Sequence, residues 1–285
     1  MSKKLFLSSM GFNKFSLKQM IDCCKENGWG LEFSSGLSYI EQAEKIFLKS
    51  KINKLAHNYF PAPKTPFVLN LASSNINIRK KSIDHCKKGL QLAFKSKGPF
   101  FSAHAGFCMD PNPEMLGKKF ELDDLLFDKK TNRELFLDSL HELNVYAKSL
   151  GLLFLIENNV IIPSNIINGN NPLFCCQSQE IIQILDEFKG QNIGLLLDTG
   201  HLKVSAKTLG LDLIEEFKKL QKFITAFHHS DNDASKDTNN QIDEEYWFFD
   251  FLNDHKKNIH VIETRCNSLA DINGQLYLFS KYGIE

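Results

Sequence analysis

Five short apolar runs in this sequence each end at a residue that could bind a metal ion. Buried parallel strands appear in a sequence as short apolar runs, and a barrel of such strands carries its catalytic groups at the strands' C-terminal ends. Any one of these residues alone could be a solvated loop carboxylate or a hydrogen-bonded histidine, but their shared position suggests that the strand ends converge. The residues are Glu157, Asp198, His228, Glu263 and His104.

Four of these residues, Glu157, Asp198, His228 and Glu263, combine three carboxylates with one imidazole. Hard carboxylate oxygens with a single histidine suit Mn²⁺, Mg²⁺, Co²⁺ or a catalytic Zn²⁺, whereas a structural zinc usually takes thiolates. Three negative charges at one place would repel one another strongly without a cation. The sequence therefore predicts that these residues hold one divalent metal ion.

Further histidines lie near the same predicted face. His57, His104 and His201 could each be an additional metal ligand, orient a ligand, or hydrogen-bond to a substrate. The pair His228 and His229 should point to opposite faces, because side chains alternate along a strand. We assign His228 to the inner face, because it lies two residues before Ser230-Asp231. The other histidines are expected to be structural, namely His85, His141, His255 and His260.

The elements that would position these residues are eight strands alternating with helical patterns. This alternation is typical of an α/β protein of the (β/α)8 TIM barrel class, and no low-complexity linker divides the chain. We therefore predict a single barrel domain over residues 1–285. An open doubly wound sheet would need a glycine-rich phosphate loop after the first strand, and residues 8–12 do not provide one. The strands are expected near residues 4–9, 30–35, 53–59, 100–106, 152–157, 193–198, 224–229 and 259–264.

Capping signals predict the ends of the helices. Ser16 and Gln19 form a capping box at the start of the first helix, and Gly28 follows its end. Ser38 with Glu41 is expected to open the second helix in the same way. The other helices are expected over residues 79–97, 131–150, 178–189, 208–222, 244–254 and 268–281.

Two of the predicted loops are longer than strand–helix alternation requires. One spans residues 58–75 and carries three prolines, and the other spans 230–243 and is rich in Asp and Asn. Both follow a strand, so both should lie on the catalytic face. We expect the segment 58–67 to shape the substrate pocket.

Composition limits the classes of protein to consider. Lys+Arg and Asp+Glu each number 34, so the formal net charge is zero, whereas binding nucleic acid through phosphates usually needs a basic excess. The seven cysteines include no CxxC pair, so we expect reduced thiols rather than a disulfide framework. No run approaches the roughly 18–20 apolar residues of a membrane span, and the apolar stretch at 5–7 is too short for a signal peptide. We expect a cytoplasmic protein with no membrane or nucleic-acid partner.

An aromatic run, Tyr246-Trp247-Phe248-Phe249, has two interpretations. Exposed aromatic residues could mark a contact between subunits of a homo-oligomer. A buried helix face is the interpretation we favour.

The order and spacing of these motifs resemble the xylose isomerase-like barrel superfamily, which includes sugar isomerases, sugar epimerases and endonuclease IV. The resemblance runs from about residue 53 to 264. It is carried by His57, Asn70-Leu71-Ala72-Ser73, His104-Ala105-Gly106, Glu157-Asn158-Asn159, Asp198-Thr199-Gly200-His201, His228-His229-Ser230-Asp231 and Glu263.

The resemblance to the epimerases implies one divalent metal held by the four ligands named above, with Glu157 and Glu263 as the acid–base pair. It implies a metal-dependent isomerase or epimerase of carbohydrate metabolism, acting on a small sugar or sugar phosphate through a metal-stabilised enediolate. His104, His201 and Arg265 would then bind hydroxyls or a charged substituent. Asp231 is a further candidate for contact with the metal or the substrate.

The resemblance to endonuclease IV implies a different chemistry, cleavage of abasic DNA with more than one zinc. There His57 and His104 would join the metal ligands, and His201 would help bind a third zinc together with an Asp-x-His sequence. This chain has Asn239 in the sequence Asp237-Thr238-Asn239, and a neutral Asn is a weaker zinc ligand than imidazole. We therefore favour sugar chemistry. A lyase or dehydratase reaction stays open, as does a barrel that binds a ligand without turnover.

Overall fold

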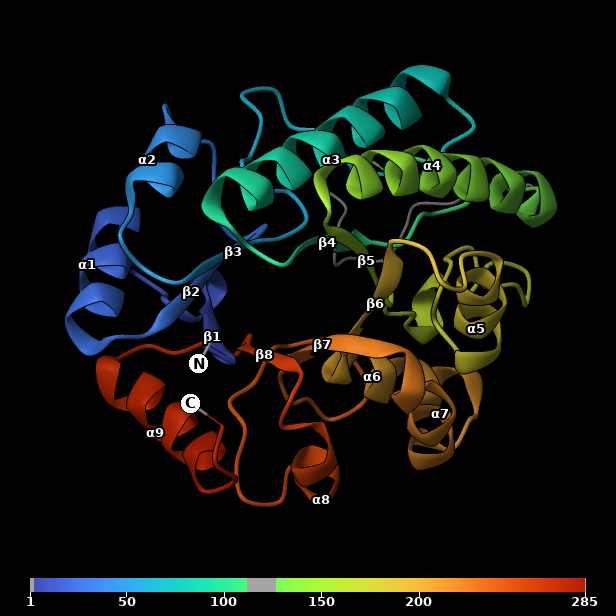
Figure 1. Ribbon diagram of the computed structural model, residues 1–285. Helices are drawn as coiled ribbons and strands as arrows, with labels where there is room; N and C mark the ends of the chain where they lie inside the picture. Colours follow the sequence, from blue (N-terminus) through green and yellow to red (C-terminus); the bar gives the residue numbers. More distant parts are fainter. Residues whose placement is uncertain (1–2, 112–126, 285) are drawn as a thin grey trace.

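The computed structural model describes residues 3–111 and 127–284, and its parallel strands form the predicted (β/α)8 TIM barrel (Figure 1). The strands are β1 (Leu5–Ser8), β2 (Gly30–Phe33), β3 (Lys54–Ala56), β4 (Phe100–His104), β5 (Leu153–Glu157), β6 (Ile193–Asp198), β7 (Ile224–His229) and β8 (Ile259–Ile262). Hydrogen bonds join them in the order β3-β2-β1-β8-β7-β6-β5-β4. At the remaining edge His57 pairs with Ser102, so the barrel is nearly closed.

Helices surround the strands, and α3 and α4 pack side by side along one flank (Figure 1). The helices are α1 (Leu17–Asn27), α2 (Ala43–Lys49), α3 (Ile76–Ser96), α4 (Lys129–Leu150), α5 (Ser178–Glu187), α6 (Thr199–Leu209), α7 (Leu213–Leu220), α8 (Phe249–Leu252) and α9 (Leu269–Ser280). The capping box of Ser16 and Gln19 is present at the start of α1, and Gly28 ends that helix with a φ of 68°. These predicted boundaries of α1 are confirmed.

The expected start of the second helix was wrong. α2 begins at Ala43 rather than after Ser38, because Gln42 adopts a left-handed conformation with a φ of 62°. A right-handed helix cannot continue through such a residue. The start of α3 also differs, since Asn75 caps it ahead of the expected residue 79. At α4 the cap is Asp128, ahead of the expected Thr131.

The segment expected as one helix over 208–222 is divided between two helices. α6 begins directly after β6, where the side chain of Asp198 accepts a hydrogen bond from the backbone N–H of His201. Gly210 then ends α6 in the left-handed conformation, and Asp212 caps α7. The sequence pattern predicts Asp198 only as a metal ligand, and nothing in it indicates the helix that this residue caps.

The helix expected over 244–254 is also shorter than predicted. α8 covers only Phe249–Leu252 and is followed by a turn of 3₁₀-helix at Asn253–His255. Three residues of the aromatic run are buried, as favoured, but only Phe249 of them lies in a helix: Tyr246, Phe248 and Phe249 are each 5 % exposed or less. Because Phe248 packs on Phe217 of α7 and Phe227 of β7, this run belongs to the interior.

The barrel interior is filled by one apolar layer below the strand ends. Seven of the eight strands each contribute one side chain to it, and β2 contributes Gly30, whose Cα faces the ring of Phe6. A packed layer of this kind closes the barrel on one side, so ligands can reach the strands only from the C-terminal end. The side chains are Phe6, Leu55, Phe100, Leu155, Leu196, Ala226 and Val261.

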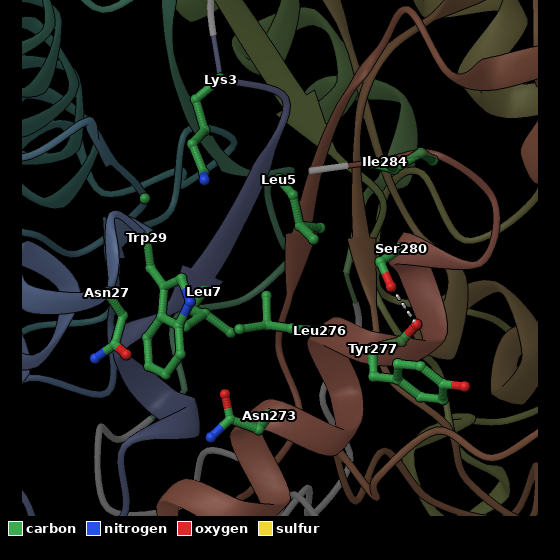
Figure 2. A pocket seen from close by; sticks show the side chains of 11 residues that line it. Lys3, Leu5, Leu7, Asn27, Trp29, Asn273, Leu276, Tyr277, Ser280 and Ile284 are labelled. Atoms are coloured by element: carbon green, nitrogen blue, oxygen red, sulfur yellow. Dashed lines mark hydrogen bonds between the residues drawn. The ribbon is translucent and has the colours of Figure 1, made fainter.

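Outside the barrel, a hollow of about 370 Å³ lies between β1, the segment after α1, and α9 (Figure 2). Leu5 and Leu7 reach it because they alternate with the inward-facing Phe6. Figure 2 shows the indole of Trp29 beside Leu7, whereas the ring of Tyr277 points away from the hollow. None of the candidate metal-binding residues lines this hollow.

All seven cysteines are free and buried. In the described part of the chain, no helix is both long enough and apolar enough to cross a membrane.

Candidate metal centre

The four predicted metal ligands come together at the C-terminal ends of four neighbouring strands. Glu157 is the last residue of β5, Asp198 is the last residue of β6, His228 lies within β7, and Glu263 follows β8 directly. One potential ligand atom from each lies within 4.8 Å of the others, and all four residues are buried. Parallel register causes this convergence, because Asp198 pairs directly with His228 across the sheet.

His228 is at the middle of this group. Its Nδ1 lies 2.8 Å from Oε2 of Glu263 and 3.3 Å from Oε1 of Glu157. Its other ring nitrogen, Nε2, lies 3.1 Å from Oε2 of Glu32. His228 shares the inner face of β7 with Ala226 of the interior layer, whereas His229 faces outward and stacks on Phe227.

Several buried polar atoms of this group have no hydrogen-bond partner among the described residues. Oδ2 of Asp198 is one of them, and Nδ1 of His228 and Oε2 of Glu157 lie close to charged neighbours without the alignment of a hydrogen bond. Buried polar groups are normally hydrogen-bonded, and each exception in a native fold needs a cause. These atoms are also the donor types that a divalent cation prefers. The residues present therefore fit a metal ion.

Electrostatics support the same interpretation. Burial raises the pKa of the Asp198 carboxyl to about 7, although the nearby His201 acts in the opposite direction. Burial disfavours ionised Glu157 as well, but the charges of His104, His57 and His228 hold its pKa well below its usual range. The pKa of His228 is raised well above its ordinary value, because Glu32, Glu263 and Glu157 outweigh the effect of burial. The group is thus arranged to hold positive charge.

A second group of possible ligands shares Glu157 with the first. Oε2 of Glu157 lies 3.1 Å from Nε2 of His57 and 3.5 Å from Nδ1 of His104. The other ring nitrogen of His57, Nδ1, forms a hydrogen bond with Oγ of Ser102 at 2.9 Å, which orients the ring. A metal ion could also bind here, because one ligand atom from each of His57, His104 and Glu157 lies within 4.8 Å of the other two.

His201 lies beside both groups but is oriented by other partners. Its Nδ1 lies 2.8 Å from the carbonyl oxygen of Asn158, and because that oxygen can only accept, Nδ1 carries the proton. Its Nε2 lies 3.3 Å from Oδ2 of Asp237. Among residues 3–111 and 127–284, neither His201 nor Asp237 belongs to a group close enough to hold a metal.

The family profile described as "Xylose isomerase-like TIM barrel" matches residues 12–277. The chain belongs to this xylose isomerase-like family. A curated relative, an uncharacterized protein of Methanocaldococcus jannaschii, is 29 % identical over 208 residues, which are 72 % of this chain and 69 % of that protein.

Two solved structures share the fold of this xylose isomerase-like barrel. A D-tagatose 3-epimerase-like protein has a TM-score of 0.73 at 18 % identity and covers 98 % of this chain and 96 % of its own. The 3-keto-D-glucoside 4-epimerase of E. coli has a TM-score of 0.68 at 12 % identity and covers 98 % of each chain. At these identities the likeness shows the fold.

Two residues of this xylose isomerase-like barrel that contact the centre were missed from the sequence. Glu32 on β2 is fully buried and, with His57 and His228, forms a third group of possible ligands. The sequence feature that could have revealed Glu32 is the presence of a carboxylate between Leu31 and Phe33, inside an apolar run. The resemblance to endonuclease IV implies Asp237 only in a zinc site, and no local pattern predicts its contact with His201.

Two further predicted site residues lie apart from these groups. Asp231 forms an ion pair with Lys203, with 2.6 Å between Nζ and Oδ1. Arg265 is exposed and lines a separate hollow beside Ser9 and Gly36. Its backbone N–H donates to the carbonyl of Asn239, at 2.8 Å.

A cavity of about 880 Å³ adjoins the centre and is bordered by His104 and His201. Its walls come from loops that follow β2, β3, β4, β5 and β7. The long loops predicted over 58–75 and 230–243 both contribute, through Phe67 and Asp237 among others. Both therefore lie on the face where the strands end, as predicted.

Proposed function

We propose that this protein is a divalent-metal-dependent isomerase or epimerase acting on a sugar or sugar phosphate. One observation carries the proposal: Glu157 and Glu263 both approach Nδ1 of His228, and with Asp198, whose Oδ2 has no hydrogen-bond partner among the described residues, they form a buried group of ligand atoms. Membership of the xylose isomerase-like family and the names of the two structural neighbours, an epimerase-like protein and an epimerase, support it.

Glu157, Asp198, His228 and Glu263 would hold the metal ion. A divalent cation bound there would polarise the substrate carbonyl and stabilise the enediolate that forms when the neighbouring carbon loses its proton. The remaining chemistry belongs to the chain, and it consists of moving one proton from carbon and back to carbon.

The two glutamates would move this proton. The pKa of Glu263 is lowered, because the charge of His228 outweighs the effect of burial, so Glu263 is an ionised base at neutral pH. The hydroxyl of Ser8 donates to its Oε1 at 3.1 Å and orients it. One glutamate would take the proton from the carbon beside the carbonyl. Return of a proton to the opposite face of that carbon gives an epimer, and return to the adjacent carbon gives an isomer.

Solvent exchange tests this proposal directly. The protein would be stripped with EDTA, reloaded with Mn²⁺, Co²⁺, Mg²⁺ or Zn²⁺, and incubated in D₂O with a panel of ketoses, aldoses and their phosphates. We expect deuterium on the carbon beside the carbonyl of at least one compound, measured by NMR. Asp231→Asn should retain the exchange and Glu263→Gln should lose it. Failure of every metal with every compound would contradict the proposal.

A second function, a zinc phosphodiesterase acting on abasic DNA, is favoured by the second ligand group of His57, His104 and Glu157. Two-metal phosphodiesterase sites place their ions roughly 3.5–4 Å apart, and a shared Glu157 would suit that spacing. Asn239 and the zero net charge count against it. Zinc content per chain and nicking of an abasic oligonucleotide decide it. Two bound zincs with nicking would favour the nuclease, and one metal without nicking would exclude it.

A further inference from the structure

The cavity beside the metal centre has two kinds of lining. The polar lining includes His104, His201 and Asp237, which belong to the centre or contact it. The rest mixes polar side chains, among them Asn58, Ser164 and Thr238, with apolar side chains from three separate loops, and most of its surface is apolar. The apolar side chains include Tyr59, Phe67, Phe107, Val160, Ile162 and Leu173.

The aromatic part of this lining is held rigidly. The hydroxyl oxygen of Tyr59 accepts a hydrogen bond from the backbone N–H of Phe67 at 2.6 Å, and the two ring centroids are 5.5 Å apart. The ring of His85 packs behind both, 5.4 Å from Tyr59 and 6.0 Å from Phe67. Lys81 places its Nζ 4.2 Å from the centroid of Phe67. The wall is therefore preformed, which lowers the entropy cost of binding a flat apolar group.

A free sugar matches the polar side of this cavity but not its apolar side. It carries a hydroxyl on nearly every carbon, and each hydroxyl placed against Val160, Ile162 or Leu173 would lose water without gaining a hydrogen bond. The C–H face of a sugar can pack on an aromatic ring, but aliphatic side chains provide no hydrogen-bond partner for its hydroxyl groups. The volume of about 880 Å³ is also that of pockets that hold drug-sized ligands, roughly 300–1,000 Å³.

We propose that the substrate is a glycoside-like hydroxy ketone that carries an aromatic group, with the ketone at the metal centre and the aromatic group against Tyr59, Phe67 and Val160. This inference rests on the proposed isomerase or epimerase function and specifies its substrate class. No bond to the aromatic group changes during the reaction. One C–H bond beside the carbonyl breaks and one re-forms, and the proton passes through a glutamate.

Binding of unreactive probes tests the inference without requiring turnover. Phenyl β-D-glucoside and methyl β-D-glucoside both lack the ketone and differ only in the apolar group. By calorimetry on the metal-loaded protein, we expect the phenyl compound to bind at least about tenfold more tightly, the range that apolar pockets achieve. Phe67→Ala should remove most of this preference. Val160→Thr, a nearly isosteric change at a half-buried position, should reduce it without a risk to folding. Tyr277→Ala is the matched control, because that ring is 63 % exposed beside the other hollow.

Three results would overturn the inference: equal affinity for the two glucosides, no binding of either, or a phenyl preference that both variants retain. Loss of the proposed function is a separate result. If no compound exchanged deuterium while the phenyl preference depended on Phe67 and Val160, the apolar site would stand and the isomerase proposal would fail. If free ketoses exchanged deuterium but the phenyl glucoside bound no more tightly, the isomerase proposal would stand and the apolar site would fail.

Discussion

Glu157 contacts several histidines of the candidate centre, because its two carboxylate oxygens face different histidines. One of its carboxylate oxygens lies within 3.5 Å of His57 and His104, and the other lies within 3.9 Å of His228 and His201. Among the described residues, Glu157 is the one side chain that belongs to both of these ligand groups. Its position as the last residue of β5 follows from the register, which places it directly beside His104 of β4.

Glu32 should tune metal affinity through His228 without being one of the four proposed ligands. Its carboxylate lies 3.1 Å from Nε2 of that histidine, so it orients the ring and raises the basicity of Nδ1. Removing the charge of such a partner typically weakens metal binding by about 10–100-fold. We expect Glu32→Gln to show this loss in a competition titration with a fluorescent chelator. Glu41→Gln, at an exposed position, is the control, and equal affinities for wild type and Glu32→Gln would refute the role.

His85 should make the fold sensitive to acid. Burial lowers its pKa to about 4, and hydrogen bonds with the backbone near Asn58 and Tyr59 oppose this only in part. The unfolded chain, with an ordinary pKa near 6.5, binds the proton more readily, so stability contributed by this residue is present above pH 6.5 and is lost as the pH falls towards 4. At about 1.4 kcal/mol per pKa unit, the loss approaches about 3 kcal/mol.

Denaturant titrations at several pH values measure this dependence. We expect the unfolding free energy of His85→Gln to fall less than that of the wild type between pH 6.5 and 4. His141→Gln, at an exposed position, should follow the wild type. Parallel curves for wild type and His85→Gln would show that His85 does not carry the effect.

Among the elements, α3 and β4 are joined by an unusually close contact. Gly89 of α3 lies directly beneath the ring of Phe101, which is fully buried on the outer face of β4. A Cβ at position 89 would overlap this ring. The contact positions the strand that carries His104, so the helix supports the centre from outside the barrel.

Two glycine-to-alanine changes in helices should therefore have opposite effects. Gly89→Ala should lower the unfolding free energy by about 1–3 kcal/mol, because the overpacked ring must move within a filled core. Gly274→Ala in α9, where nothing lies within 4 Å of the added Cβ, should raise it by about 0.5–1 kcal/mol, because alanine favours the helix. Thermal or urea denaturation measures both. Equal effects of the two changes would contradict the packing argument.

At the scale of the whole molecule, the barrel concentrates buried charge at one end of an apolar interior. The layer formed by Phe6, Leu155, Leu196 and the other inward side chains lies below the carboxylates of the centre. Buried carboxylates that face one another destabilise a fold unless positive charge balances them. Metal binding and folding should therefore be coupled.

Added metal should stabilise the fold by mass action. At a free metal concentration 100-fold above its dissociation constant, the gain is about 2.7 kcal/mol, which should raise the melting temperature by several degrees. EDTA should remove this increment. Asp198→Asn should abolish the response to Mn²⁺ or Zn²⁺, whereas Asp231→Asn, at a residue that pairs with Lys203 and lies apart from the ligand group, should keep it. A melting temperature that is the same with EDTA and with metal would argue against a metal centre.

Much of the fold could be predicted from the sequence, because its signals are local. Apolar runs marked the strands, and the capping box at Ser16 and the glycine at position 28 marked α1. The errors arose where a residue has two roles or an unexpected backbone conformation. Asp198 both caps α6 and belongs to the ligand group, and the left-handed Gln42 delays α2.

The sequence by itself determined which strand ends carry Glu157, Asp198, His228 and Glu263. Parallel strands in a barrel bring their C-terminal ends to one face, so position along the chain was sufficient to predict that they meet. Only the tertiary structure decided what surrounds them. Glu32 lies 196 positions before His228 in the sequence, and the walls of the cavity come from five loops that no local pattern relates. Such contacts depend on packing between distant segments, which the sequence does not record.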